Sequence, residues 1–123
     1  MEVGIQMIFQ SFGYGDDMTD SQVYDEEIEL GVLADELGFD GVIINEHHQN
    51  AYGLMASPNL IASALSQRVK RAQMIVLGNA LPMYGNPVRV AEEYAMLDLL
   101  FQGRFQAGFV VGVFGDAHKT THL

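Results

Sequence analysis

Short apolar runs alternate with amphipathic segments along this 123-residue chain. Four runs are rich in β-branched or aromatic residues between turn signals, which is typical of buried strands, and they span residues 3–9, 41–45, 73–77 and 105–111. Between them, apolar residues recur every three or four positions, which predicts helices over about 20–37, from Pro58 onward, and over about 87–100. The last three strands begin 32 residues apart, at positions 41, 73 and 105. This repeat predicts an α/β fold with a parallel sheet in the order 1-2-3-4 and three helices on its outer side.

Capping residues mark the predicted helix boundaries. Thr19, with Gln22 three residues later, fits a capping box, and Gly38 is a left-handed stop. Ser57 and Asn86 each precede a proline, which predicts an N-cap with proline at the first helical position. In the first helix we expect two opposite faces: a buried one of Leu30, Leu33, Ala34 and Leu37, and a solvated one of Asp25, Glu26, Glu27, Glu29 and Glu36.

Composition and charge exclude several classes of protein. The chain is 49% apolar, but none of its apolar runs is long enough to span a bilayer, and no basic region precedes an apolar one at the N-terminus. It has no cysteine for a disulfide or a thiolate. The net charge is −10 and the six bases are scattered, whereas a nucleic-acid surface needs a basic stripe. We therefore expect a soluble, cytoplasmic protein that binds neither nucleic acid nor a membrane.

The polar residues that follow the second predicted strand are the first part of a candidate site. Asn45, Glu46, His47 and His48 come directly after an apolar run, at the strand end where α/β proteins carry their chemistry. Asn45 and His47 would lie on the same side of the strand, where an imidazole can act as acid, base or donor near neutral pH. A histidine satisfied by backbone groups at a strand end would give the same pattern, so the spacing leaves both interpretations open.

The loop after the third predicted strand forms the second part of the candidate site. Gly78, Asn79 and Ala80 lie at the same edge of the sheet, and small side chains let a flat ligand approach the backbone, although an ordinary βα loop has the same composition. The sequence has no phosphate-binding glycine fingerprint and no metal-binding histidine spacing on a helix. Glu46, His47 and the next histidine alternate in direction on an extended chain, so we predict no metal site.

The order of these motifs resembles that of the luciferase-like flavin monooxygenases, the superfamily of bacterial luciferase and of alkanal- and alkanesulfonate-type oxygenases. The resemblance extends from Val3 to about Gly112. It rests on several landmarks in the same order: Gly38-Phe39-Asp40, Glu46-His47-His48, Ser57-Pro58-Asn59, Gly78-Asn79-Ala80-Leu81-Pro82, Asn86-Pro87-Val88-Arg89-Val90-Ala91-Glu92-Glu93, Leu97-Asp98 and Gly103-Arg104-Phe105.

This resemblance implies a (β/α)₈ barrel of the TIM type, present here as about half a barrel of four parallel strands and three helices. The chain would form a single domain over residues 1–123, with an irregular tail over 113–123. Reduced FMN would lie at the C-terminal mouth of the barrel, supplied by a separate flavin reductase. Molecular oxygen would be the cosubstrate, and a small organic molecule would be oxidised.

The resemblance also assigns roles to residues of this chain. It implies catalytic positions at His47 and His48 and cofactor-binding positions at Asn45, Glu46, Asn79 and Ala80. It implies an unusual peptide, cis or strained, within residues 79–81. It further implies that the second and third helices form the interface of a homo-oligomer.

Two features depart from the family pattern. Val111 stands where members commonly carry an arginine that meets the FMN phosphate, and the chain ends at Leu123, before four further strands. We therefore expect a truncated chain, or a half-barrel that must assemble, with weak FMN binding and little coupled oxygenation by itself. The alternatives are a non-catalytic remnant that serves as an oligomeric or partner-binding module, and a deazaflavin-dependent relative that transfers hydride.

Overall fold

The computed structural model describes residues 1–11 and 18–111 of the chain. Strands and helices alternate along it: β1 (Gly4–Met7), α1 (Asp20–Leu37), β2 (Gly41–Ile44), α2 (Pro58–Leu65), β3 (Gln73–Ala80), the short 3-10 helix η2 (Leu81–Met83), α3 (Pro87–Phe101) and β4 (Phe105–Val110). The predicted irregular tail over 113–123 lies outside the described residues. Within the described residues, no helix is long and apolar enough to cross a membrane.

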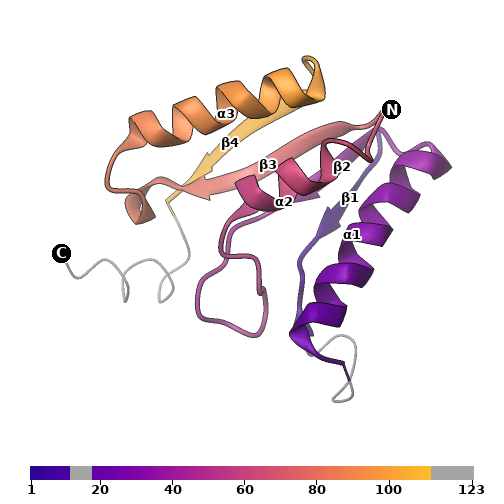
Figure 1. Ribbon diagram of the computed structural model, residues 1–123, viewed down its shortest axis with the longest axis horizontal. Helices are drawn as coiled ribbons and strands as arrows, with labels where there is room; N and C mark the ends of the chain where they lie inside the picture. Colours follow the sequence, from indigo (N-terminus) through magenta and orange to yellow (C-terminus); the bar gives the residue numbers. More distant parts are fainter. Residues whose placement is uncertain (12–17, 112–123) are drawn as a thin grey trace.

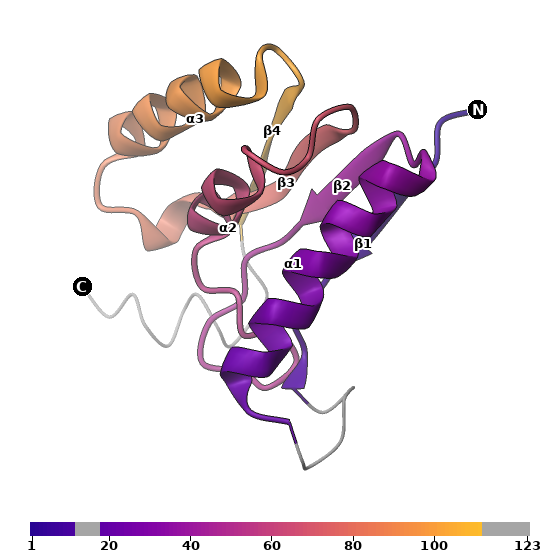
Figure 2. The same ribbon diagram turned by 45° about the vertical axis from the view of Figure 1, so that its right-hand side comes forward.

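The four strands form one parallel sheet in the order β1-β2-β3-β4. All three helices lie over one face of this sheet, with α1 against β1 and β2, α2 against β3, and α3 against β4 (Figure 1). The turned view shows α1 running across β1 and β2 (Figure 2). The predicted strand order, the parallel direction and the placement of the helices are confirmed.

The hydrophobic core lies between the sheet and the helices because alternate strand residues point to opposite faces. Val42 and Ile44 of β2 are fully buried against the helices, together with Met74 and Val76 of β3. The helices contribute buried partners to the same core: Val32, Ala34, Ile61, Ala62, Leu65, Val90, Tyr94, Leu97 and Phe101. The other face of the sheet carries a row of uncharged residues in register: Gln6, Ile43, Ile75 and Gln106.

The ends of the helices follow the predicted capping chemistry. Thr19 and Gln22 form the reciprocal capping box of α1, and Gly38 ends that helix with a φ of 95°. The Asn86 side chain accepts from the backbone N–H of Val88 at 3.0 Å and caps α3. Ser57 occupies the N-cap position of α2, but its side chain makes no capping hydrogen bond.

The predicted faces of α1 are wrong in part. Leu30, Leu33 and Leu37 are exposed, Leu37 by 68%, whereas Glu27 is buried with Val23, Gly31, Val32, Ala34 and Asp35. The reason is a close approach at Gly31, where an added Cβ would lie 2.9 Å from the sulfur of Met7. The lack of a side chain at Gly31 lets this side of the helix pack closely on β1, and the three leucines turn outward.

Asp35 joins α1 to the segment that enters β3. Its carboxylate accepts backbone N–H groups from Lys70 at 2.8 Å, Arg71 at 3.0 Å and Ala72 at 2.6 Å. Burial raises the pKa of Asp35, but these three hydrogen bonds and the Arg71 guanidinium outweigh burial, so the pKa is lowered from its ordinary value. The segment that enters β3 is therefore tied to α1.

Candidate functional site

The carboxyl ends of the strands meet at a pocket of about 420 Å³. Residues from β1, the β2–α2 loop, β3 and the end of β4 line it: Gln6, Asn45, Glu46, His47, Tyr52, Leu77, Gly78, Val110 and Val111. The structure thus brings three of the six predicted site residues to one cavity. His48, Asn79 and Ala80 lie next to it and are joined to it through Glu46.

The His47 imidazole is held by the loop that follows β2. Its backbone N–H donates to the carbonyl of Met55 at 2.9 Å, and its ring packs edge-to-face on Tyr52 with the ring centroids 5.1 Å apart. Gly53 lies directly against the ring, because an added Cβ there would approach the His47 Cδ2 to 2.8 Å. The loop therefore folds back on the imidazole and fixes its place in the pocket wall.

Glu46 is the hydrogen-bonding centre of the site. Its side chain is fully buried, and Oε1 accepts from Nε2 of His48 at 2.7 Å. Oε2 accepts from the Asn79 amide at 2.9 Å, the backbone N–H of Ala80 at 3.1 Å and the Tyr84 hydroxyl at 2.8 Å. These donors come from the β2–α2 loop, from β3 and from the segment after η2, so one carboxylate fixes all three relative to one another. A direct contact between Glu46 and a cofactor stays a prediction.

Tyr84 is a site residue that the sequence analysis missed. Its hydroxyl accepts from the Asn79 amide at 2.9 Å while it donates to Glu46. Burial, followed by the hydrogen bond to Glu46 and the charge of that carboxylate, raises the pKa of Tyr84 well above its ordinary value. Tyr84 therefore keeps its proton and its donor role at neutral pH. The only signal in the sequence is its position in the loop after the third strand.

The end of β3 differs from the prediction. The strand continues three residues past Leu77, and after an irregularity its Asn79 and Ala80 pair with Phe109 and Val110 of β4. The structure has a cis peptide bond between Leu77 and Gly78, so the unusual peptide lies two residues before the predicted segment. Asn79 and Ala80 belong to the strand ladder instead. Gly78 faces β4 closely, since an added Cβ would lie 2.6 Å from the backbone carbon of Gly108.

A comparison with family models matches residues 1–121 to the luciferase-like monooxygenases. The chain belongs to this family. The resemblance stated from the sequence is thereby confirmed. The alkanal monooxygenase alpha chain of Photobacterium leiognathi is 36% identical over 93 residues, which cover 76% of this chain and 26% of the relative. The oxygenase component of the flavin-dependent trigonelline monooxygenase of Acinetobacter baylyi is 30% identical over 104 residues, 85% of this chain and 29% of the relative.

Solved structures of luciferase-like enzymes share the fold. The oxygenating constituent of 3,6-diketocamphane monooxygenase from Pseudomonas putida, in complex with FMN, superposes with a TM-score of 0.88 at 22% identity over 100% of this chain and 33% of its own. An F420-dependent secondary alcohol dehydrogenase superposes with a TM-score of 0.77 at 20% identity, over 99% of this chain and 35% of its own. This luciferase-like chain therefore spans about a quarter to a third of the length of the relatives it matches. Its four parallel strands and three helices correspond to part of a barrel.

The chemistry of the pocket fits the ring of FMN, but it does not fit the phosphate. Asn45 is 6% exposed, and its Oδ1 has no hydrogen-bond partner among residues 1–11 and 18–111, so it offers an acceptor to a ligand. Among the described lining residues there is no Lys or Arg to meet a phosphate, and Val111 is exposed at the mouth. The part of the chain that the structure describes also holds no cluster of three or more His, Asp or Glu residues placed to bind a metal.

Proposed function

We propose that this chain forms the flavin-ring side of an FMN-dependent luciferase-like monooxygenase that oxidises a small organic molecule with oxygen. The observation that carries the proposal is the pocket at the strand ends, which His47 lines together with Asn45, whose Oδ1 has no partner among the described residues, and with Glu46 and its hydrogen-bond network. The Pseudomonas putida neighbour is a complex with FMN, and the Acinetobacter baylyi relative is named as an oxygenase component. A separate flavin reductase that supplies reduced FMN fits both.

In this proposal the protein supplies position and proton transfer. Bound reduced FMN supplies the electrons that activate oxygen. His47 lines the pocket with its ring held by Tyr52, and it gives or takes a proton there. His48 carries a proton on Nε2 towards Glu46, because a carboxylate only accepts hydrogen bonds. Asn79 is positioned behind the pocket by the same carboxylate.

The experiment is an anaerobic titration of the 123-residue chain with reduced FMN, followed by mixing with oxygen. We expect measurable but weak binding, because without two or three charge-assisted contacts to the phosphate the affinity falls by at least about a hundredfold. We expect an oxygen-dependent spectral change that is altered in His47→Ala and unchanged in the surface variant Glu92→Ala. No binding of reduced FMN, or sub-micromolar affinity with stoichiometric substrate oxidation, would contradict this account.

A deazaflavin-dependent hydride transferase is the second candidate. The observation that favours it is the fold shared with an F420-dependent dehydrogenase, together with the pocket at the strand ends of this chain. The same titration with a reduced deazaflavin separates the two, since oxygen leaves reduced deazaflavins largely unreacted. A remnant that acts only as a partner-binding module would bind neither ring.

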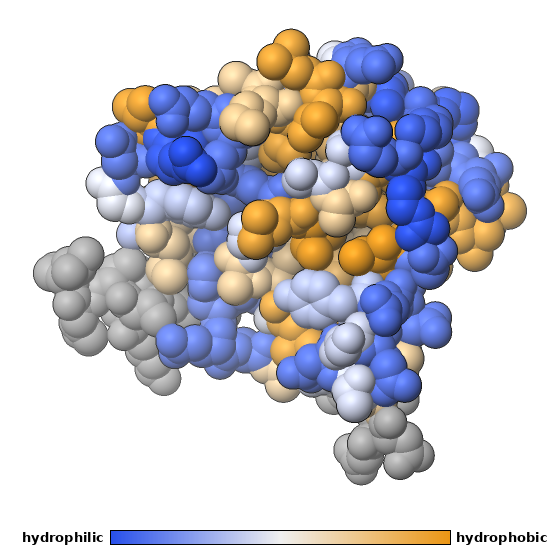
Figure 3. Space-filling view, in the orientation of Figure 1, coloured by the Kyte–Doolittle hydropathy of each residue, from blue (hydrophilic) through white to orange (hydrophobic). Residues whose placement is uncertain are grey.

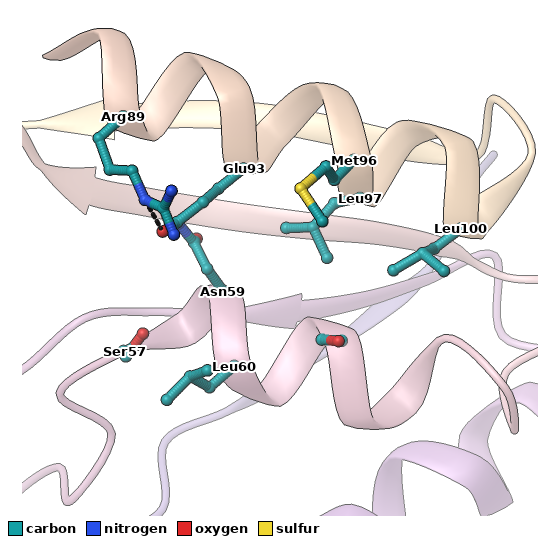
Figure 4. A pocket seen from close by; sticks show the side chains of 9 residues that line it. Ser57, Asn59, Leu60, Arg89, Glu93, Met96, Leu97 and Leu100 are labelled. Atoms are coloured by element: carbon teal, nitrogen blue, oxygen red, sulfur yellow. Dashed lines mark hydrogen bonds and ion pairs between the residues drawn. The ribbon is translucent and has the colours of Figure 1, made fainter.

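We also propose that the chain forms a homo-oligomer through the groove between α2 and α3. This groove, of about 400 Å³, is lined by Ser57, Asn59, Leu60, Ser63, Arg89, Glu93, Met96, Leu97 and Leu100 (Figure 4). Apolar side chains gather on this face of the molecule, over α2 and α3 (Figure 3). Leu60 is 71% exposed, and contiguous exposed apolar residues on a polar surface mark protein interfaces.

Polar groups in the same groove support a protein partner of matching chemistry. Glu93 accepts from the Asn59 amide at 2.7 Å and from the Nε of Arg89 at 2.9 Å. Oδ1 of Asn59 is buried and has no partner among the described residues, so it offers an acceptor at the base of the groove. A second copy would present the same amide, guanidinium and carboxylate groups, and an isologous contact pairs such a patch with itself.

A further inference from the structure

Asn45 is the polar group of the pocket whose own hydrogen bonding is incomplete. Its side chain is 6% exposed, and within residues 1–11 and 18–111 no donor reaches its Oδ1. Buried side-chain oxygens in proteins are almost always paired, and an unpaired one regains free energy when a ligand donates to it. Because Asn45 also lines the pocket, its carbonyl oxygen calls for an N–H or O–H group on the molecule that binds there.

The surrounding side chains restrict what carries that donor. Leu77, Gly78 and Val110 give the pocket apolar or bare-backbone walls, which suit the face of a flat ring. His47, which the proposed function uses for proton transfer, lies two residues after Asn45 and lines the same pocket. The donor therefore belongs to the edge of the ring at which proton transfer takes place.

Resting on the proposed function, we propose that Asn45 is the specificity-determining residue for the cofactor: its Oδ1 accepts the N–H at ring position 5 of reduced FMN. Oxidised FMN has a lone pair at that nitrogen in place of the hydrogen. A reduced deazaflavin has a carbon there, and its C–H groups are poor donors. Asn45 thus favours reduced FMN over oxidised FMN, and also over a reduced ring that lacks the nitrogen.

The test measures dissociation constants of the 123-residue chain for three probes under anaerobic conditions: reduced FMN, oxidised FMN and reduced 5-deaza-FMN. We expect the chain to bind reduced FMN about tenfold more tightly than either of the others, the effect of one satisfied buried acceptor. Asn45→Leu has a similar volume without the amide, and it should bring both ratios to within about twofold of unity. Gln67→Leu removes an exposed amide outside the pocket and should leave both ratios unchanged.

One comparison needs no variant. It is the ratio of the dissociation constants of reduced FMN and reduced 5-deaza-FMN, both measured on the unchanged chain. A ratio near unity there overturns the inference while leaving flavin binding intact. Unaltered ratios in a folded Asn45→Leu chain, checked by its melting temperature, overturn it as well. Failure of the unchanged chain to bind any of the three probes overturns the proposed function, and this inference with it.

Discussion

Removal of the Glu46 side chain should greatly lower the free energy of unfolding of this chain. In Glu46→Ala, the Asn79 amide and the backbone N–H of Ala80 lose their carboxylate acceptor, and both groups are buried. The donors on Tyr84 and His48 are only partly buried, so they can turn towards water. The Asn79 amide keeps its hydrogen bond to Tyr84, so the change removes one buried hydrogen bond to the carboxylate from each of the two residues. A hydrogen bond to a charged group contributes about 1.5–3 kcal/mol, which gives a loss of about 4 kcal/mol in the free energy of unfolding.

This loss is large compared with the total free energy of unfolding of the chain. Domains of this size are stable by about 5–15 kcal/mol, so the change removes about a quarter or more of the total. Relief from burying the carboxylate offsets part of the loss, which is why we count only the two buried donors. With a urea dependence of about 2 kcal/mol per molar, the unfolding midpoint should fall by about 2 M. Urea unfolding followed by circular dichroism measures this directly, with Glu92→Ala on the exposed face of α3 as the control.

The variant Glu46→Gln separates the effect of the hydrogen bonds of Glu46 from the effect of its negative charge. Its amide oxygen can still accept from Asn79, Ala80 and Tyr84, but its NH₂ group now faces Nε2 of His48, which must become an acceptor. We expect a loss of only about 1 kcal/mol together with transfer of the His48 proton from Nε2 to Nδ1, visible in ¹⁵N spectra of the imidazole. A midpoint in Glu46→Ala within 0.5 M (about 1 kcal/mol) of the unchanged chain would refute the central role of this carboxylate.

Three further predictions follow from the fold and the groove. Because the folded-state pKa of Asp35 is lowered, its contribution to stability is present above the ordinary pKa of 3.8 and is lost as the pH falls through the folded-state pKa. In Asp35→Asn the stability should therefore depend less on pH in this acid range, as measured by acid unfolding followed by fluorescence. Gly53→Ala should displace the His47 ring and lower the free energy of unfolding by about 1–3 kcal/mol, as measured by thermal unfolding. Gly85→Ala should leave it unchanged, because a Cβ added there meets no atom of a non-neighbouring residue within 4 Å. Leu60→Glu should shift a dimer to monomer in sedimentation velocity while Leu37→Glu on α1 does not, and a chain already monomeric at micromolar concentration would contradict the dimer.

The features that sequence could predict are those decided within a few residues. The capping box at Thr19, the stop at Gly38 and the Asn86 cap each depend on groups two to four positions apart, and all three are confirmed. The strand order followed from the regular βα spacing, because short right-handed crossovers leave few other arrangements. The cluster at Asn45–His47 was found for the same reason, since it directly follows a strand.

The features that sequence missed depend on contacts between distant segments. The inward face of α1 is set by Gly31 against Met7 and by Asp35 against the segment entering β3. No periodicity within the helix records those partners, so the leucines were placed on the wrong side. Tyr84 was missed likewise, because its hydroxyl reaches a carboxylate 38 residues earlier in the chain.

The site divides into two parts that differ in what this chain provides. The side on which we propose proton transfer is built from a short stretch of sequence, since the hydrogen-bond partners of the Glu46 side chain among the described residues lie between His48 and Tyr84. These side-chain contacts lie within the described strands and loops, so we expect His47 and Asn79 to keep their places whatever covers the other face of the sheet. A phosphate grip is not found among the described lining residues. Ring recognition and phosphate recognition should therefore be separable by experiment: riboflavin, which lacks the phosphate, should bind this chain about as well as FMN, within about threefold, because neither gains a charge-assisted contact.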